Sequence, residues 1–466
     1  MDSNPINKQN KVKSFFNKTN EDNSSLEDSD SDLDEEQKEI FFSNKHAKSS
    51  DSQPNNNQNS LNLSLNESEK INLNSSTNNN NNNSNVEDQN QNNNNNEIDI
   101  FNSVYEPGSN KGGNIIKHDQ FYKQFILDPG NEGRKASRVL FLRSFNNWVK
   151  ATMINKYSFK LSDKTGEHLS VLDLCCGRGG DLEKYFRSKV RIYVGSDLAE
   201  ESLKNAIDRY EKLKNEKFKD LKCKCYFICE DLSSSKNNLM LRIPQEIKFD
   251  LVSCQFALHY HFESEARLRS FLNNVVERLN NGGFFVGTII DSNVLVKKLR
   301  ESKKDKRNVY KDEKFTFGNQ FYAVKFSQKR FPVEKSYGIR YGFFLEDSID
   351  KRDENGKFSF VGEYLIIFNK LVEICKEFDL HLVDKKNFHE FYAENSQNKF
   401  YKNMLNKMLK DYDNPSAKDQ WDIIYLYMMF AFQKGLPVNR RYEPVLKSNN
   451  IVIKDWEPVL ITDKFE

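Results

Sequence analysis

A glycine cluster in residues 171–181, VLDLCCGRGGD, has the residue types and spacing to bind a nucleotide. It follows an apolar run that predicts a buried strand, and its glycines let main-chain N–H groups approach a ligand closely. Asp197 ends the next predicted strand, 20 residues after Gly177. A carboxylate at that distance can accept hydrogen bonds from both hydroxyls of an adenosine ribose. The cluster and the acid together predict a site for an adenosine-containing ligand.

Other interpretations of this stretch are less suitable. A dinucleotide loop would need a third glycine at Leu182, and a Walker phosphate loop would need Gly-Lys-Ser or Gly-Lys-Thr. A metal or redox site on Cys175 and Cys176 fits poorly, because adjacent cysteines lack the usual spacing of metal ligands and no histidine cluster completes a set. We therefore expect no metal, and expect the cysteines to fill apolar space. A glycine turn with two surface acids is the alternative to a binding site.

The elements that must position these residues alternate between strand and helix. Strands are predicted at 168–175, 191–198, 224–231, 249–258 and 282–291, and helices at 180–188, 200–215 and 264–279. Five strands separated by helices imply right-handed crossovers and a parallel sheet covered on both faces. The predicted fold class is therefore α/β, a Rossmann-like doubly wound and mostly parallel sheet. The glycine cluster would then lie at the carboxyl end of the first strand, where open α/β sheets bind ligands.

Further elements flank this alternation. Apolar residues at three- and four-residue spacing predict a helical lead-in at 121–130 and 137–158. After residue 292 we predict a lysine-rich loop at 303–314 and two β-like stretches at 321–327 and 337–347. A helix is predicted at 364–378 and a buried strand at 421–434.

The charge of the chain is distributed unevenly. Residues 1–111 are rich in Asn and Ser and contain 9 Lys and Arg against 19 Asp and Glu, whereas residues 112–466 contain 61 against 49. The first segment has too little apolar surface to offset its ordering entropy, so we predict a disordered acidic tail at 1–114 and a folded domain at 115–466. A basic body with an acidic tail indicates a polyanionic partner, although a solvated charged surface is an equal alternative.

The compartment follows from what the sequence lacks and from its cysteines. There is no basic-then-apolar signal at the N-terminus and no apolar stretch of about 20 residues, so we expect neither secretion nor membrane insertion. Seven cysteines without framework spacing favour a reducing compartment, the cytosol or the nucleus.

Six stretches in a particular order are similar to one enzyme family: SRVLFLRSFNNWVK (137–150), LDLCCGRGGD (172–181), SCQFALHYHFES (253–264), GGFFVGTIIDS (282–292), FGNQFYAVKF (317–326) and WDIIYLYMMFAFQK (421–434). Over roughly residues 115–435 they resemble the eukaryotic mRNA cap guanine-N7 methyltransferases, which have the class I S-adenosylmethionine-dependent fold. The stretches with FNNW and HYHFES are far more particular to this family than the glycine cluster.

The resemblance implies a role for each matching position. Those that match the S-adenosylmethionine site are Lys150, Asp173, Cys175, Gly177, Asp197, Asp231, Gln255 and Tyr260. Asp173 would lie near the methionine amino group and Asp231 near the adenine N6. Those that match contacts to the cap are Asn146, Asn147, Arg178, Lys184, Arg209, His259, Glu363 and Tyr427. Cys175 departs from the family, which usually has glycine at that position.

The side-chain chemistry agrees with these roles, although each residue also has a structural alternative. Glu363 could accept from the guanine N1–H and amino group, while Tyr260 stacks on the base and Tyr427 closes the pocket. Three cations suited to a triphosphate are Arg178, Lys184 and Arg209.

The structural alternatives are ordinary ones. Glu363 could be an acid at the start of a helix, and Lys184 and Arg209 could be solvated. His259 could be a hydrogen-bonded histidine at a strand end, Tyr427 a core residue, and Asn146 and Asn147 polar residues on a helix face.

The chemistry implied by the resemblance needs no acid or base. Guanine N7 carries a lone pair and a sulfonium methyl is already electrophilic, so we expect a direct in-line displacement in which His259, Glu363 and Tyr260 only position the reactants. Alternatives are a methyltransferase of another RNA nucleobase or small molecule, and a non-catalytic cap- or RNA-binding module. The family also implies a nuclear location, capped mRNA as partner, and capping or transcription machinery as a partner of the tail. We expect a monomer.

Overall fold

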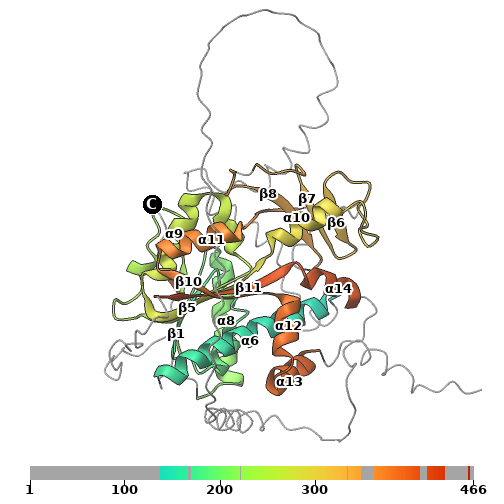
Figure 1. Ribbon diagram of the computed structural model, residues 1–466. Helices are drawn as coiled ribbons and strands as arrows, with labels where there is room; N and C mark the ends of the chain where they lie inside the picture. Colours follow the sequence, from blue (N-terminus) through green and yellow to red (C-terminus); the bar gives the residue numbers. More distant parts are fainter. Residues whose placement is uncertain are drawn as a thin grey trace, which may run out of the picture. The chain divides into compact units, whose positions relative to one another are not determined.

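The computed structural model describes residues 137–165, 169–220, 222–332, 334–347, 360–409, 417–435 and 460–461 (Figure 1). The predicted tail at 1–114 and the beginning of the predicted domain lie outside the described residues. Within the described part of the chain, no helix combines the length and apolar character needed to cross a membrane.

An eight-stranded sheet forms the centre of the fold, in the order β10-β11-β5-β4-β1-β2-β3-β12. Its parallel strands are β1 (Ser170–Leu174), β2 (Ile192–Asp197), β3 (Lys224–Cys229), β4 (Phe249–Gln255), β5 (Leu279–Ile290) and the short β12 (Leu460–Ile461). β11 (Tyr427–Lys434) and β10 (Leu380–Asn387) continue the sheet antiparallel beyond β5. The five predicted parallel strands and the fold class are confirmed.

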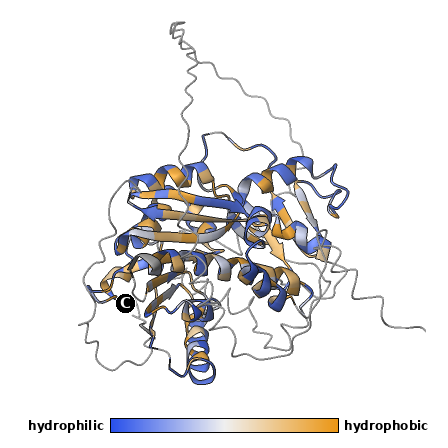
Figure 2. Ribbon diagram, turned by 60° about the horizontal axis from the view of Figure 1, so that its bottom comes forward, coloured by the Kyte–Doolittle hydropathy of each residue, from blue (hydrophilic) through white to orange (hydrophobic). Residues whose placement is uncertain are grey.

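Helices cover both faces of this sheet because their apolar residues recur at helical spacing. α8 (Glu200–Glu216) begins with two acids at its positive end and buries Leu203, Ala206 and Tyr210. It shares one face of the sheet with α6 (Leu140–Thr165) and α7 (Leu182–Arg187). α9 (Glu265–Val276) and α11 (Phe368–Glu377) bury their apolar residues on the opposite face. Figure 2 shows the hydrophobic residues concentrated on the strands and on the helix faces that cover them.

A second, antiparallel sheet has the strand order β6-β7-β8-β9. Its strands are β6 (Thr316–Asn319), β7 (Tyr322–Phe326), β8 (Arg340–Leu345) and β9 (Val361–Tyr364), and α10 (Ser292–Glu301) connects β5 to it. The two β-like stretches predicted at 321–327 and 337–347 correspond to β7 and β8. β9 ends this sheet and carries Glu363.

Three predicted boundaries are wrong. Residues 421–434 are not one strand, because Trp421–Ile424 belong to α14 (Ala417–Ile424) and β11 begins only at Tyr427. A short apolar run does not distinguish a buried helix from a buried strand. The helix predicted at 364–378 begins at Phe368, and Glu363 therefore lies in a strand instead of heading a helix. The strand predicted at 249–258 ends at Gln255, so His259 lies in the short 3₁₀ helix η2 (Leu258–Glu263) and not at a strand end.

The sequence analysis also missed elements near the C-terminus. α12 (Phe388–Asn395) and α13 (Lys399–Met408) follow β10 and pack against α6. β12 pairs in parallel with β3, Leu460 opposite Phe227, so the extension after residue 435 contributes to the edge of the central sheet.

Candidate functional site

The glycine cluster forms the turn between β1 and α7, as its residues require. Gly177 and Gly179 have φ angles of 52° and 65°, a region that favours glycine. A Cβ at Gly179 would lie 2.6 Å from a Leu182 side-chain atom, so glycine allows this close packing. A Cβ at Gly177 would meet nothing within 4 Å, so the turn is open on that side. The turn therefore has room for a ligand beside its main chain.

Asp197 lies beside this turn at the end of β2. Its Oδ2 accepts a hydrogen bond of 2.8 Å from the Gly177 N–H, and its Oδ1 accepts one of 3.0 Å from the Ala199 N–H. The structure thus brings Asp197 into contact with the glycine turn, as expected from its position 20 residues after Gly177 in the sequence. A carboxylate oxygen can accept more than one hydrogen bond, and the contact of Asp197 with a ribose stays a prediction.

Cys175 adopts a backbone conformation that favours glycine. Its φ is 57°, in the left-handed region, and its Sγ lies 3.6 Å from His261 Nε2. The neighbouring Cys254 thiol and burial raise the pKa of Cys175, so it remains a neutral thiol. A neutral thiol is a poor nucleophile, because the thiolate is the reactive form.

We predict that Cys175→Gly folds and retains activity. Glycine relieves a left-handed conformation that costs about 1–2 kcal/mol, but it also adds about 0.5–1 kcal/mol of unfolded-state entropy. The free energy of unfolding should therefore change little, and cofactor affinity should be unchanged or modestly higher. Denaturant unfolding and calorimetric titration with cofactor measure both. A large loss of affinity in a folded variant would show that the thiol itself contributes to the site.

A buried acid that the sequence analysis did not select joins three of the predicted residues. Asp181 Oδ1 lies 2.8 Å from Lys150 Nζ and 2.8 Å from Lys184 Nζ, and Lys184 also donates to Asn147 Oδ1 at 3.2 Å. Burial alone would raise the pKa of Asp181, but the two lysines outweigh it and hold the pKa well below its usual range. Lys184 is therefore part of a largely buried ion-pair cluster, not a solvated lysine.

Asp173, the second-last residue of β1, is buried near the same turn. Tyr193 and Tyr185 donate to its two oxygens at 3.0 and 3.2 Å. Burial and the charge of Asp181 raise its pKa to about 7, while the tyrosine hydroxyls act in the opposite direction. These contacts stabilise the base of the turn, and the contact of Asp173 with a methionine amino group stays a prediction.

The other predicted cofactor residues lie at the ends of neighbouring strands. Asp231 follows β3, accepts from the Ser233 N–H at 3.0 Å and lies 3.7 Å from Arg267 Nη2. Gln255 ends β4, where its amide donates to Ser253 Oγ and accepts from Thr288 Oγ1, both at 3.0 Å. These two bonds use one N–H and one lone pair of the Gln255 side-chain amide, so its second N–H, its second lone pair and its main chain are the groups left for a ligand.

A second cluster surrounds Glu363, which is only 2% exposed. Tyr341, directly opposite on β8, donates its hydroxyl to Glu363 Oε2 at 2.5 Å. Burial raises the pKa of Glu363 to about 7, and the Tyr341 hydrogen bond limits that rise. Burial, with a further contribution from the charge of Glu363, raises the pKa of Tyr427, the buried first residue of β11. Tyr341 of β8 in the four-stranded sheet and Tyr427 of β11 in the central sheet therefore both lie close to the buried carboxyl group of Glu363.

His259 completes this cluster as a neutral side chain. Its Nε2 lies 3.6 Å from Glu363 Oε1, which is too long for a hydrogen bond. Burial lowers the pKa of His259 to about 3, so no ion pair forms with Glu363 at neutral pH. Neither ring nitrogen has a hydrogen-bond partner among the described residues. Buried polar atoms without partners are rare in folded proteins, and these point to a polar ligand.

Phe256 connects the two clusters. Its ring is 5.2 Å from that of Tyr427 and 5.9 Å from Lys150 Nζ. It follows Gln255 and has a φ of 56°, an uncommon conformation for an aromatic residue and one that concentrates at functional sites.

On the adjoining helix α6, Asn146 Oδ1 is buried with no hydrogen-bond partner among the residues that the structure describes. Tyr260 lies next to His259, with 4.0 Å between ring centroids.

The structure thus groups most predicted residues into these clusters, and Arg178 and Arg209 form a further pair. Arg209 Nε on α8 donates to the Arg178 carbonyl oxygen at 3.0 Å. The residues that the sequence analysis missed are Asp181, Phe256 and Tyr341. Asp181 could have been selected from the sequence, since it is the acid immediately after the glycine cluster. The pairing of Tyr341 with Glu363 depends on strand register, which no local pattern reveals.

The parallel sheet, the glycine turn after β1 and the acid at the end of β2 define a class I S-adenosylmethionine-dependent methyltransferase. A family model, described as the mRNA (guanine-N(7))-methyltransferase domain, matches residues 104–435, more than half of the chain. The chain belongs to this family, and its cofactor is S-adenosylmethionine.

Relatives from plants and fungi agree with this assignment. The chain is 34% identical over 321 residues to the mRNA cap guanine-N(7) methyltransferase 1 of Oryza sativa subsp. japonica, covering 66% of this chain and 79% of the relative. The protein of the same name from Arabidopsis thaliana is 34% identical, with coverage of 65% and 77%. The mRNA cap guanine-N(7) methyltransferase of Cryptococcus neoformans is also 34% identical over 66% of this chain, but only 46% of that relative is covered.

Solved structures are more distant in sequence. The plantazolicin methyltransferase BamL is 15% identical with a TM-score of 0.36, covering 73% of this chain and 99% of that chain. The CcbJ methyltransferase from Streptomyces caelestis is 13% identical with a TM-score of 0.37, covering 62% and 90%.

Proposed function

We propose that this chain transfers the methyl group of S-adenosylmethionine to N7 of the terminal guanosine of a 5′ GpppN cap on mRNA. The observation that carries this proposal is the buried carboxyl group of Glu363 beside a neutral His259 whose nitrogens lack partners among the described residues. Guanine presents two adjacent donors, N1–H and the exocyclic amine, that a carboxylate can accept together. Membership of the guanine-N7 family supports the same substrate.

The residues around Glu363 would hold the base in a fixed plane. Tyr341 fixes one carboxylate oxygen, and the other faces His259. Tyr260 supplies an aromatic face for stacking, and Tyr427 closes the far side of the pocket. Asn146, with its unpartnered Oδ1 among the described residues, and Asn147, which accepts from Lys184, lie on α6 and would contact the cap.

Cations near the glycine turn would bind the triphosphate bridge. Arg178 lies in the turn, Arg209 contacts its main chain, and Lys184 lies at the start of α7. Guanidinium groups match the geometry of phosphate oxygens, and a lysine adds a point charge. Lys184 is shared with Asp181, so its positive charge is partly neutralised before any phosphate arrives.

The cofactor would be held along the carboxyl edge of the sheet. Asp197 would accept the ribose hydroxyls and Asp231 would lie near the adenine, while Lys150 would bind the methionine carboxylate. Cys175, Gly177, Gln255 and Tyr260 would line the remaining surface, and Asp173 would support the methionine end. S-adenosylmethionine supplies an electrophilic methyl group when bound.

This chain's own residues then act by position alone. Guanine N7 carries a lone pair, so no side chain has to remove a proton before attack. His259 is neutral and Glu363 accepts hydrogen bonds, so both orient the base toward the cofactor turn. Holding two reactants in line can contribute roughly 7–11 kcal/mol to lowering the barrier. The expected reaction is a single displacement without a covalent enzyme intermediate.

Transfer of labelled methyl groups to RNA tests the proposal. The purified chain should methylate GpppG-capped RNA and leave the same RNA with a 5′ triphosphate unlabelled, and nuclease digestion should release 7-methylguanosine. Label in an internal nucleobase, or no transfer by a folded protein that binds the cofactor, would contradict it.

A pH dependence should follow from Glu363. Its pKa is raised to about 7, and the protonated form offers a donor where guanine also presents donors. The KM for the cap should therefore fall as the pH rises from about 6 to about 8, and level off once the carboxylate is charged. The Tyr341 hydroxyl lowers this pKa, so Tyr341→Phe should move the midpoint to higher pH. A KM independent of pH in both proteins would exclude Glu363 as the titrating group.

A nuclear location belongs to the same proposal, because capping accompanies transcription. The acidic segment 1–111 is suited to contacts with basic surfaces of capping or transcription machinery, and we propose that it acts there.

A further inference from the structure

We propose that a basic patch around the loop between α10 and β6 binds the phosphates of the RNA chain that follows the cap. We define the basic patch as the exposed lysines of that loop, Lys303, Lys304, Lys306, Lys311 and Lys314, with Lys329 and Arg330 after β7. This inference rests on the proposed function, because the RNA is reached through its cap. It concerns the part of the substrate that does not react.

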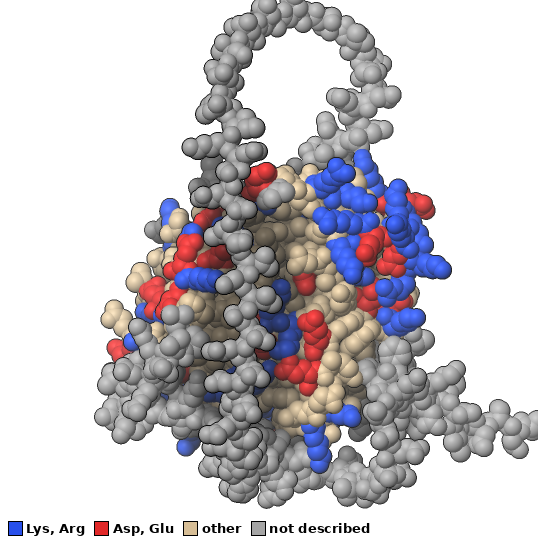
Figure 3. Space-filling model, in the orientation of Figure 1, with Lys and Arg blue, Asp and Glu red and all other residues tan. Residues whose placement is uncertain are grey.

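The segment that carries the patch holds most of the excess positive charge of the domain. Residues 297–335 contain 13 Lys and Arg against 5 Asp and Glu, a net of +8, while residues 112–466 as a whole carry +12. Figure 3 shows the resulting concentration of Lys and Arg over the part of the molecule that holds α10 and β6 to β8. None of the seven patch residues forms an ion pair with a carboxylate of the described chain. Their charges are therefore available to a polyanion.

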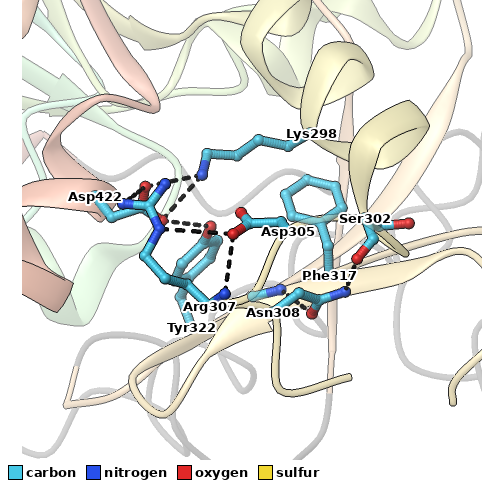
Figure 4. A pocket seen from close by; sticks show the side chains of 9 residues that line it. Lys298, Ser302, Asp305, Arg307, Asn308, Phe317, Tyr322 and Asp422 are labelled. Atoms are coloured by element: carbon cyan, nitrogen blue, oxygen red, sulfur yellow. Dashed lines mark hydrogen bonds and ion pairs between the residues drawn. The ribbon is translucent and has the colours of Figure 1, made fainter. Parts of the chain in front are cut away.

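The loop that carries these lysines is fixed at its base (Figure 4). Asp422 of α14 lies 2.9 Å from Lys298 and 3.1 Å from Arg307, around a cavity of about 10 Å³. Asn308 donates to the Ser302 carbonyl oxygen at 2.9 Å and accepts from the Gly318 N–H at 3.1 Å. Lys298 and Arg307 thus fix the loop to α14 through Asp422, and the exposed lysines belong to a loop whose backbone is held in place.

The position of the patch favours RNA over other polyanions. β9 carries Glu363 at one edge of the four-stranded sheet, and β6 and β7 lie toward the opposite edge. Three strand-to-strand steps span about 14 Å, so the patch begins a short distance from the proposed guanine pocket. An RNA chain whose first guanine is bound near β9 can reach it within a few nucleotides. The chain's own acidic segment is the competing occupant.

The test uses the full-length chain and two variants that each lose four positive charges. The patch variant replaces Lys303, Lys304, Lys306 and Lys311 with Ala. The matched control replaces the exposed Lys376, Lys399, Lys402 and Lys407, on α11 and α13, with Ala. Fluorescence anisotropy with an uncapped RNA of roughly 25 nucleotides, longer than the roughly 4–16 nucleotides of typical single-strand sites, measures RNA binding without reference to methylation.

We expect the patch variant to bind this RNA roughly tenfold to a hundredfold more weakly than the control. Its slope of log affinity against log salt should be shallower by roughly 2–3, since each phosphate contact contributes about 0.7. The KM for capped RNA should rise in parallel, while kcat/KM for the GpppG dinucleotide stays within about twofold, because the dinucleotide does not reach the patch. If the wild-type chain does not methylate GpppG, the proposed function is wrong. The anisotropy result can still be interpreted, because it measures RNA binding independently of methyl transfer.

Two outcomes would overturn the proposal. Equal weakening in the patch and control variants would show a general effect of net charge. Higher activity of the patch variant on both GpppG and capped RNA would assign the patch to the chain's own acidic segment.

Discussion

Glu363→Gln is expected to lower kcat/KM for capped RNA by roughly 100-fold to 10,000-fold without weakening cofactor binding. The carboxylate would accept two hydrogen bonds from guanine, each worth about 1.5–3 kcal/mol when one partner is charged. Glutamine has nearly the same shape, but its amide presents a donor where guanine also presents one. The loss should therefore appear for GpppG and for long capped RNA alike. Single-turnover and steady-state methyl transfer measure it.

The controls separate recognition from folding. Glu363 is buried, so the melting temperature and calorimetric affinity for S-adenosylhomocysteine must be measured for the variant. Tyr341→Phe removes one donor to the same carboxylate and should give a smaller loss with the shifted pH profile described above. If Glu363→Gln weakens cofactor and cap binding equally, the carboxyl group supports the fold and does not recognise guanine.

Asp197→Ala should abolish measurable cofactor binding. Two hydrogen bonds from ribose hydroxyls to a charged acceptor are worth roughly 3–6 kcal/mol, or about 100-fold to 10,000-fold in affinity. The variant also loses the acceptor for the Gly177 and Ala199 N–H groups, which loosens the turn and acts in the same direction. Isothermal titration calorimetry with S-adenosylhomocysteine gives the affinity directly.

Asp231→Ala provides the matched comparison, since Asp231 follows the neighbouring strand β3 and accepts from one main-chain N–H, that of Ser233. A single contact near the adenine predicts a smaller loss, roughly tenfold to a hundredfold. Circular dichroism should show that both variants remain folded. An Asp197→Ala variant that binds cofactor as tightly as wild type would refute the ribose assignment.

Local patterns account for the part of the fold that was predicted correctly. The five parallel strands have apolar runs, and β1, β2 and β4 are followed by helices with an acid in the first turn; such signals are contained within one element. The family also follows from short stretches in a fixed order. Where the apolar run continued without a turn signal, as from Trp421 to Lys434, helix and strand could not be separated by periodicity.

The candidate site was only partly predictable, because its contacts join segments distant in sequence. Glu363 meets Tyr341 through strand register, and Asp181 meets Lys150 across 31 residues. No pattern within either segment encodes the partner. The individual ligand contacts and the domain boundaries stay predictions, as does the acidic tail, which lies outside the described residues.

The strand order of the central sheet has a consequence for how the chain is made. β11 occupies the position beside β5, yet about 140 residues separate the two strands in the sequence, and β12 reaches β3 only at residue 460. During synthesis, β5 therefore leaves the ribosome long before its neighbour exists, and its unpaired edge is buried only when Tyr427–Lys434 has emerged. Chains released before residue 427 would expose this apolar edge and lack Tyr427, so premature termination would yield aggregation-prone fragments instead of a smaller working enzyme.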